Sequence, residues 1–439
     1  MRARGASFEP LPGPEGLPRL LYGMDLDGEG PMTLGEHARL HGPLPLLSTY
    51  ELIETIERSG LRGRGGADFP TAVKLRAVAE RRRASAVVVN GSETEPASAK
   101  DKLLLMRLPH LVLDGAVLAA RAVGVREVLV VAPERARGTL KALEGAISLR
   151  RGSDDGVAIT LVNTPGGYVT GEESAVINYL NAGRALPTFV PPRPFERGYR
   201  SRPTLIQNPE TLAQIALVAR YGEHWYRQLG TPGDPGSVLV TISGAVAAPG
   251  VYELAFGTSF GDLLGAAGGA TEPLRALLVG GYFGTWVDAA RAMELRLARE
   301  ELRGAGCALG AGVLFALGES ACGLHESARV IDYLAAESAG QCGPCVHGLR
   351  AIADAVAGLA DGVAAPSERE RLLRWCGDVR GRGACHHPNG AVRFVESTLE
   401  VFAAELEWHR GNRCGALPAD LPLRHHGLEP VRTLRRRAA

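Results

Sequence analysis

Residues 60–75, GLRGRGGADFPTAVKL, have the composition of an anion-binding loop. The segment contains four glycines, two arginines and a lysine, and it leads into a predicted helix. Because glycine has no Cβ, its backbone N–H groups can approach a phosphate closely, and the N-terminus of the next helix adds partial positive charge. Lys74, one turn into that helix, adds a full charge. The segment therefore predicts a site for a phosphate-bearing ligand.

Three other polar segments lie where a parallel α/β sheet usually binds its ligands. They are NGSETEPASAKD at 90–101, which directly follows the strand-like run 85–89, GGYVTGEE at 166–173, and PTLIQNPET at 203–211. Ligands of open parallel sheets bind at the carboxyl ends of the strands. Each segment alone is more typical of a helix cap than of a site. Together with the glycine loop they strengthen the prediction of a binding site.

The cysteines suggest a metal centre rather than disulfides. Seven cysteines are scattered over 439 residues, which is not the pattern of a secreted disulfide framework. Cys342 and Cys345 form a C-x-x-C pair, and Cys385 follows forty residues later. With His347 or His386 nearby, this spacing suits zinc and an iron–sulfur cluster comparably well. The four cysteines outside this motif receive no ligand role, because free cysteine is commonly a small buried hydrophobe; they are Cys307, Cys322, Cys376 and Cys414.

Alternating helical and β-rich segments must position these residues. We expect helices at 50–59, 103–123, 138–147, 172–181 and 210–220, and strands at 85–90, 127–132 and 157–163. Such alternation is typical of an α/β fold with a doubly wound parallel sheet.

The second half of the chain has a different pattern. After the Pro- and Gly-rich stretch 230–236, residues 238–254 predict a β-hairpin and 259–267 a short helix. Helical patterns at 328–336, 345–359, 367–375 and 391–408 predict a four-helix bundle. The predicted units are an irregular N-terminal arm at 1–45, a ligand-binding α/β domain at 46–235, a small β domain at 236–300, a four-helix domain at 325–412 and a basic tail at 413–439.

The overall charge argues against a nucleic-acid-binding surface. Lys and Arg total 49 against 48 Asp and Glu, which gives a net charge of +1. No run of about 18 apolar residues and no N-terminal signal core is present, so we expect a cytoplasmic protein without a transmembrane segment.

The four polar segments, taken in order, resemble the FMN- and NADH-binding flavoprotein subunit of bacterial respiratory complex I, that is, the family of NADH-quinone oxidoreductase F subunits. The resemblance covers residues 50–408. It implies a Rossmann-like FMN domain, a ubiquitin-like β-grasp (SLBB-like) domain and a helical bundle that carries one iron–sulfur cluster. It also implies other redox subunits or a ferredoxin-like carrier as partners, with peripheral attachment to the inner face of the cytoplasmic membrane through those partners.

The resemblance assigns roles residue by residue. The residues implied to bind the flavin are Gly63, Arg64, Gly65, Lys74, Asn90, Ser92, Glu93, Tyr168, Gly171, Glu172, Glu173, Asn208 and Thr211. Phe69 is implied to stack on the adenine of NADH, and Glu95 and Glu173 to lie near the nicotinamide ribose as the catalytic pair. Cys342, Cys345 and Cys385 are implied to be cluster ligands, which favours iron–sulfur over zinc.

The chain departs from the family pattern at several of these places. Ser92 replaces an aspartate and Asp68 a glycine of the flavin loop, and Ala339 stands where the first cluster cysteine would be. Three thiolates suggest a 4Fe-4S cluster with a different fourth ligand or a 3Fe-4S cluster. The aromatic clamp for the dinucleotide is reduced, since aligned positions read Ala77, Val190 and Arg193.

The leading interpretation is an oxidoreductase that takes electrons from NADH through FMN to an iron–sulfur cluster. The reduced clamp motivates a second interpretation, in which the same cofactors exchange electrons with a ferredoxin or a membrane redox partner. A third is a catalytically silent scaffold that holds zinc or no metal.

Overall fold

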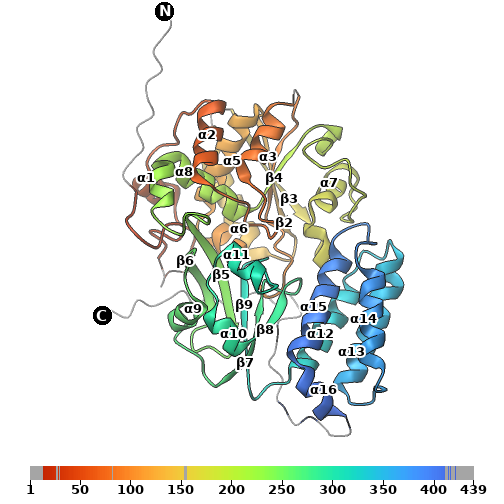
Figure 1. Cartoon of the computed structure of the whole chain (residues 1–439). Coiled ribbons are helices and arrows are strands. Elements are labelled where there is room, and N and C mark those ends of the chain that lie inside the picture. Colours follow the sequence, from red (N-terminus) through yellow and green to blue (C-terminus); the bar gives the residue numbers. More distant parts are fainter. Residues whose placement is uncertain are drawn as a thin grey trace, which may run out of the picture.

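The computed structural model describes residues 13–25, 28, 30–81, 83–152, 156–410, 414, 416 and 421. Two sheets and a group of helices make up this part of the chain (Figure 1). The predicted basic tail at 413–439 lies almost entirely outside the described residues.

The first sheet is parallel, as predicted, with strand order β3-β2-β1-β4. The strands are β1 (Val87–Asn90), β2 (Glu127–Pro133), β3 (Ala158–Thr164) and β4 (Leu205–Gln207). β1 is a run of fully buried valines in which Val88 lies beside Leu129 of β2 and Ile206 of β4. Such continuous apolar runs are typical of strands covered on both faces. The short strand β4 was not among the expected strands.

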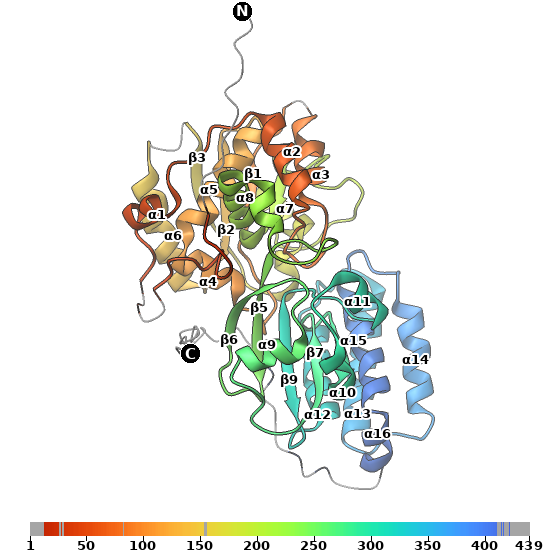
Figure 2. The ribbon, with the colours of Figure 1, turned by 60° about the vertical axis from the view of Figure 1, so that its left-hand side comes forward.

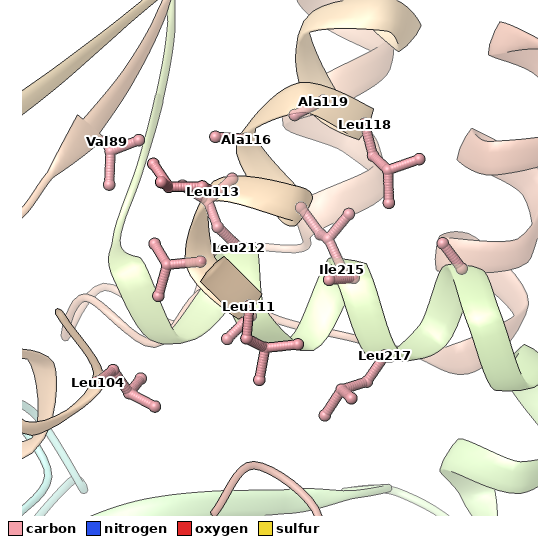
Figure 3. Packing of buried hydrophobic residues seen from close by; sticks show 14 of the residues in the cluster. Val89, Leu104, Leu111, Leu113, Ala116, Leu118, Ala119, Leu212, Ile215 and Leu217 are labelled. Atoms are coloured by element: carbon pink, nitrogen blue, oxygen red, sulfur yellow. The ribbon is translucent and has the colours of Figure 1, made fainter. Parts of the chain in front are cut away.

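Helices cover both faces of this sheet. Val87 and Val89 join a large core with α2 (Thr49–Ser59), α3 (Thr71–Ala79), α5 (Pro109–Val123), α6 (Arg137–Arg150) and α8 (Pro209–Arg227), whereas Val88 joins a smaller one with α7 (Glu173–Ala182). Figure 3 shows the interface of α5 and α8 at close range, with Leu111, Ala116, Leu118, Leu212, Ile215 and Leu217 among its labelled residues. The 3-10 turns η1 (Tyr168–Gly171) and η2 (Tyr199–Ser201) precede α7 and β4 respectively.

Two segments differ from the expected helices. The expected helix at 103–123 is instead two helices, α4 (Lys100–Arg107) and α5, bent by 96° at Pro109. Proline fits the first turn of a new helix but interrupts a continuous one. The expected irregular arm contains α1 (Leu34–His41), which a capping box of Thr33 and Glu36 begins.

The second sheet is mixed, with order β6-β5-β9-β7-β8. Its elements are β5 (Ser237–Gly244), β6 (Gly250–Ala255), α9 (Phe260–Ala266), β7 (Leu274–Val279), β8 (Thr285–Asp288), α10 (Ala289–Glu294), α11 (Arg299–Gly304) and β9 (Val313–Gly318). The expected hairpin is the antiparallel pair β5–β6. The central strand β9 follows the predicted boundary at residue 300, so this sheet extends further along the chain than expected.

The C-terminal part is helical, as predicted. It consists of α12 (Gly323–Ala336), the π-helix η3 (Pro344–Leu349), α13 (Arg350–Ala360), α14 (Glu368–Val379), α15 (His387–Val401) and α16 (Ala403–His409). Figure 2 shows these helices packed beside the second sheet. The division into domains at 46–235, 236–300 and 325–412 stays a prediction, and β9 favours extending the second of these ranges.

In the part of the chain that the structure describes, no single helix is long and apolar enough to cross a membrane. Only the bent pair α4 and α5 meets the length and composition criteria when joined, and α5 is almost wholly buried in the core.

Candidate flavin and iron–sulfur sites

The main cavity lies where the first sheet, the second sheet and the helical region meet. It has a volume of about 540 Å³. The sequence-predicted residues that line it are Arg64, Gly65, Asn90, Glu93, Glu95, Tyr168, Gly171, Glu172, Asn208 and Cys385. The second sheet adds Gly280 and Phe283, and the helical region adds Asn389 and Arg393. Residues from all four polar segments and one thiol therefore share a single cavity.

The glycine loop is folded back on itself at one wall of this cavity. The backbone N–H of Gly63 donates to the carbonyl of Phe69 at 2.8 Å, and that of Arg64 donates to Oγ1 of Thr211 at 2.9 Å. Gly66 has a φ of 96°, which side chains rarely adopt. A Cβ at Gly65 would lie 3.3 Å from the Cβ of Asn208. Glycine thus keeps open the space that a ligand needs.

The side chain of Arg64 does not act as a free cation in this loop. Its guanidinium donates to the hydroxyl of Tyr226 at 3.1 Å and to the carbonyl of Ser237 at 3.3 Å, and it lies over the ring of Phe256. The backbone of this residue is therefore the part that suits ligand binding.

A buried ionic network supports the loop from below. Lys100 Nζ donates to the carbonyl of Arg64 at 3.1 Å and pairs with Glu210 at 2.8 Å and Asp101 at 3.0 Å. These neighbours outweigh burial and hold the pKa of Lys100 above its usual value, whereas burial raises the pKa of Asp101 to about 7. Our sequence reasoning did not single out Lys100 and Glu210. Their sequence neighbours are polar, as in SAKDK and QNPET, so no local signal marked these two residues as buried.

The segment after β1 presents an amide, a hydroxyl and a carboxylate. Asn90 Nδ2 donates to the carbonyl of Gly171 at 2.8 Å, and the buried Oγ of Ser92 has no hydrogen-bond partner in the described structure. Glu93 Oε1 accepts from Ser98 Oγ at 2.7 Å and from the backbone N–H of Asp101 at 3.0 Å. Burial would raise the pKa of Glu93, but Lys102, Lys100 and these hydrogen bonds together hold it below the usual value. Glu93 therefore stabilises the start of α4 as well as lining the cavity.

Glu95 is a buried acid of the cavity wall. Its Oε2 accepts from the hydroxyl of Tyr168 at 2.8 Å and from the backbone N–H of Tyr282 at 2.9 Å. Burial raises its pKa to about 6, although these hydrogen bonds favour the charged form. The ring of Tyr168 also contacts Phe283 edge-on, with centroids 4.8 Å apart.

The paired glutamates have different partners. Glu172 caps α7, because its Oε2 accepts from the backbone N–H of Ser174 at 2.9 Å and of Ala175 at 3.1 Å. Glu173 forms an ion pair with Lys74, which links α7 to α3. Neither Lys74 nor Glu173 lines the main cavity, so the structure places this pair outside its wall.

Asn208 and Thr211 begin α8 beside the glycine loop. Asn208 Oδ1 accepts from the backbone N–H of Thr211 at 3.0 Å, and its Nδ2 donates to Asp101. Thr211 is fully buried, so it orients the loop through Arg64 rather than facing the cavity.

The two residues that end the glycine loop lie outside the main cavity. Asp68 stands where the family has a glycine, and its φ of 48° lies in the left-handed region that favours glycine. Its carboxylate is paired with Arg62 at 2.9 Å and with Arg299 at 3.4 Å. Asp68 and Gly63 line an adjoining cavity of about 500 Å³. Phe69 is half-exposed, so its ring is accessible.

The three predicted cluster cysteines lie near one another. Cys345 is buried, its backbone N–H donates to the carbonyl of Cys342 at 3.1 Å, and burial together with the nearby thiols Cys342 and Cys385 raises its pKa to about 12. Burial also raises the pKa of Cys385. Cys345 lies within the π-helix η3, and such helices occur frequently at functional sites.

These thiols suit an iron–sulfur cluster. An iron–sulfur cluster is held by thiolates spread around several atoms. Similarly, the glycine loop lines a cavity of about 540 Å³ with its backbone at Gly65, where an added Cβ would crowd Asn208, so the residues present fit FMN as well.

Comparison with known proteins decides the family. Residues 56–217 match the model of the Nuo51 FMN-binding domain, residues 239–281 the SLBB domain, and residues 318–409 the NADH-ubiquinone oxidoreductase-F iron-sulfur binding region. The chain is 31% identical to the NADH-quinone oxidoreductase F subunit of Salmonella typhimurium, over 87% of this chain and 90% of that protein. The chain belongs to this family of F subunits. The predicted family, fold class and cofactor-binding regions are confirmed.

Another F subunit and a hydrogenase give the same result. The NADH-quinone oxidoreductase F 2 subunit of Rhizobium meliloti is 30% identical over 85% of this chain and 92% of that protein. The crystal structure of an NAD+-reducing NiFe-hydrogenase in the H2-reduced state has a TM-score of 0.78 at 31% identity, covering 85% of this chain. The present F-type protein spans 64% of that hydrogenase chain's length. These relatives are named as subunits of redox enzymes, which confirms the coarser expectation of redox-subunit partners.

Proposed function

We propose that this F-type protein oxidises NADH at an FMN held in the main cavity and passes the electrons to an iron–sulfur cluster bound by Cys342, Cys345 and Cys385. One observation carries the proposal: Cys385 lines the same cavity as the glycine loop, so a cluster ligand and the flavin site share a wall. Bound FMN supplies a group that accepts a hydride and releases electrons singly.

The chain's own residues would bind and orient the cofactor. The backbone of residues 64–66 and the start of α8 at Asn208 suit the phosphate, because helix N-termini and glycine loops bind anions. Asn90, which lines the cavity, offers its side-chain amide to the rest of the cofactor, whereas Ser92 lies behind the wall and leaves a buried hydroxyl without a partner. Glu95, held by Tyr168, would orient the nicotinamide side, whereas Glu173 pairs with Lys74 outside the cavity wall.

The fourth cluster position is the main departure from the family. Ala339 offers no ligand atom, and Gly340 next to it has a φ of 64°. We propose a cluster with three protein thiolates, of the 4Fe-4S or 3Fe-4S type. The partners would be other redox subunits that bring the protein to the inner face of the cytoplasmic membrane, or a ferredoxin-like carrier in the cytoplasm.

The test begins with protein purified without oxygen, on which FMN, iron and sulfide are measured. Rapid mixing with NADH should then bleach the flavin absorbance. If millimolar NADH does not bleach the flavin but a reduced ferredoxin does, the protein exchanges electrons with a ferredoxin or a membrane redox partner instead of NADH. The smaller aromatic clamp, with Ala77, Val190 and Arg193 at the aligned positions, motivates this second interpretation. Protein without flavin or sulfide would support the silent scaffold.

Gly65→Val tests the position of the flavin. The added methyl groups would enter space beside Asn208, and overpacking typically costs about 1–3 kcal/mol, so FMN affinity should fall about tenfold or more. Gly145→Val is the matched control, because a Cβ at Gly145 in α6 meets nothing within 4 Å. Equal FMN content in both variants would show that the flavin lies elsewhere.

A further inference from the structure

A second group of metal-ligating side chains lies far from the flavin cavity. In the described part of the chain, Cys322, His325 and Cys414 place their ligand atoms within 4.8 Å of one another, and so do Cys322, Glu405 and His409. Cys322 precedes α12, and the other end of that helix reaches Glu337, whose carboxylate accepts from the backbone of Tyr168 at the cavity. The fourteen residues of α12 span roughly 20 Å, so this group is separate from the cluster cysteines.

The central members of this group are oriented as metal ligands usually are. His409 is buried, and its Nδ1 lies 2.6 Å from the carbonyl of Ala360. A carbonyl only accepts, so Nδ1 carries the proton and Nε2 presents a lone pair. That Nε2 lies 3.4 Å from Sγ of Cys322. A histidine ligand typically donates its other ring N–H to a carbonyl in this way.

Burial raises the pKa of the Cys322 thiol to about 12, but one hydrogen bond to its sulfur favours the thiolate. The backbone N–H of His325 donates to Cys322 Sγ at 3.4 Å at the N-terminus of α12. Thiolates are favoured at such positions. The rings of His325 and His409 have centroids 5.4 Å apart, so both flank the same sulfur.

We propose that Cys322, His325, His409 and Cys414 bind one zinc ion. Two thiolates and two imidazoles form a ligand set that zinc takes in structural sites, where it is four-coordinate. Glu405 has its Oε2 3.6 Å from Cys322 Sγ, but it is the less suitable fourth ligand, because its carboxylate already neutralises Arg275 through Oε1 at 2.6 Å. This proposal corrects our expectation that Cys322 and Cys414 have no ligand role.

The ion would join two parts of the chain that are distant in sequence. Cys322 begins α12, His409 ends α16 and Cys414 lies beyond it. Another residue beyond α16 already contacts α12, because buried Leu421 donates its backbone N–H to Glu326 at 3.2 Å. The zinc would therefore have a structural role, attaching the end of the chain to the helical region.

The test measures zinc, iron, sulfide and FMN on the same samples of full-length protein, grown with zinc and iron and purified without oxygen or chelator. The wild type should contain about one zinc per chain. Cys414→Ser and His325→Gln should lose most of it and keep iron, sulfide and FMN. Cys307→Ser, which changes a buried cysteine of the second sheet's core, should keep the zinc.

A further variant separates this proposal from the proposed function. Cys342→Ser should lose iron and sulfide but retain zinc. Zinc that disappears in Cys342→Ser and persists in Cys414→Ser would place the metal in the cluster motif and overturn the proposal. Wild-type protein without zinc would overturn it as well.

Cobalt provides a spectroscopic readout on the wild-type protein, with one variant as a comparison. Wild-type protein stripped of zinc and given Co²⁺ should show the visible absorption bands of a tetrahedral thiolate complex. Absence of those bands, or their persistence at equal intensity in Cys414→Ser, contradicts the assignment.

Discussion

At the scale of single residues, Glu95 shows how burial changes chemistry in the cavity wall. Its carboxylate is 8% exposed and accepts hydrogen bonds from Tyr168 and Tyr282, yet burial raises its pKa to about 6. A raised carboxyl pKa means that the charged form is less stable in the fold than in the unfolded chain. The charge on Glu95 therefore lowers the stability of the fold. This destabilisation is absent below the unfolded pKa of about 4.5 and is complete above about pH 6.

Glu95→Gln should therefore become relatively more stable as the pH rises. Relative to wild type, its free energy of unfolding should increase by about 2 kcal/mol between pH 4.5 and 7, since one pKa unit corresponds to about 1.4 kcal/mol. Denaturant unfolding of FMN-free protein over this pH range measures the difference, with the exposed Glu80→Gln as a control. A difference that stays constant with pH would contradict the assignment.

Ala339 is the residue at which this chain departs most clearly from its family's cluster motif. Ala339→Cys would restore a C-x-x-C-x-x-C run with Cys342 and Cys345. If the cluster is held by three thiolates, the variant should bind more iron per chain and lose it more slowly in air, because a fourth thiolate completes the coordination. Iron and sulfide assays over time measure this, and Ala335→Cys, a turn earlier, is the control. Identical iron retention in both variants would mean that the fourth position is already filled.

At the scale of elements, one buried carboxylate connects four helices of the first domain. Asp114 of α5 accepts from His37 of α1 at 2.7 Å and Arg150 of α6 at 2.7 Å, and it pairs with Arg220 of α8. Burial alone would raise its pKa, but His37 and the two arginines hold it well below the usual value. Its contribution to stability is therefore present above the unfolded pKa and is lost as the pH falls below it.

Asp114→Asn should destabilise the protein strongly at neutral pH. The variant leaves two arginines buried without a countercharge, and breaking a buried ion pair typically costs about 3–5 kcal/mol. Thermal unfolding measures the loss. The matched control is Glu223→Gln, which breaks the more exposed pair of Arg58 and Glu223 and should cost less than about 1 kcal/mol. Equal effects of the two variants would argue against the network.

At the scale of the whole molecule, the cavity exists only because three parts of the chain meet. The glycine loop comes from the first domain, Phe283 from the second sheet and Cys385 from the helical region. Phe283 also closes over Gly390 of α15, where an added Cβ would lie 2.3 Å from its ring. The proposed flavin site and the proposed exit for electrons thus meet at one junction.

Cys385→Ser should separate reduction of the flavin by NADH from electron transfer to the iron–sulfur cluster. Removing the cavity-lining thiol should lower the iron content by about half or more, since a cluster with two thiolates is poorly held. FMN content and flavin bleaching by NADH should persist. Electron paramagnetic resonance after NADH addition measures whether electrons reach the cluster. Cys376→Ser, a buried cysteine of α14, is the control, and a cluster signal of equal size in both variants would contradict the assignment.

The sequence by itself determined the order of the parts and the chemistry they carry. Valine runs, glycine at fixed positions and the C-x-x-C pair are local features, so the parallel sheet, the helical region and an anion-binding loop followed from composition and spacing, whereas FMN as the ligand of that loop came from the resemblance to the F subunits. The break at Pro109 and the capping box at Thr33 were also visible locally, although our expected helices did not include them.

Only the tertiary structure decided which side chains share a site. Lys100 lies under the loop, Glu172 and Glu93 cap helices, and Cys322 meets His409 and Cys414 across more than eighty residues. Such contacts depend on how whole elements pack, because the crossing of helices and sheets sets distances that linear spacing does not contain. The anion loop was therefore predictable from sequence, whereas the junction around it and the second metal-ligand group were not.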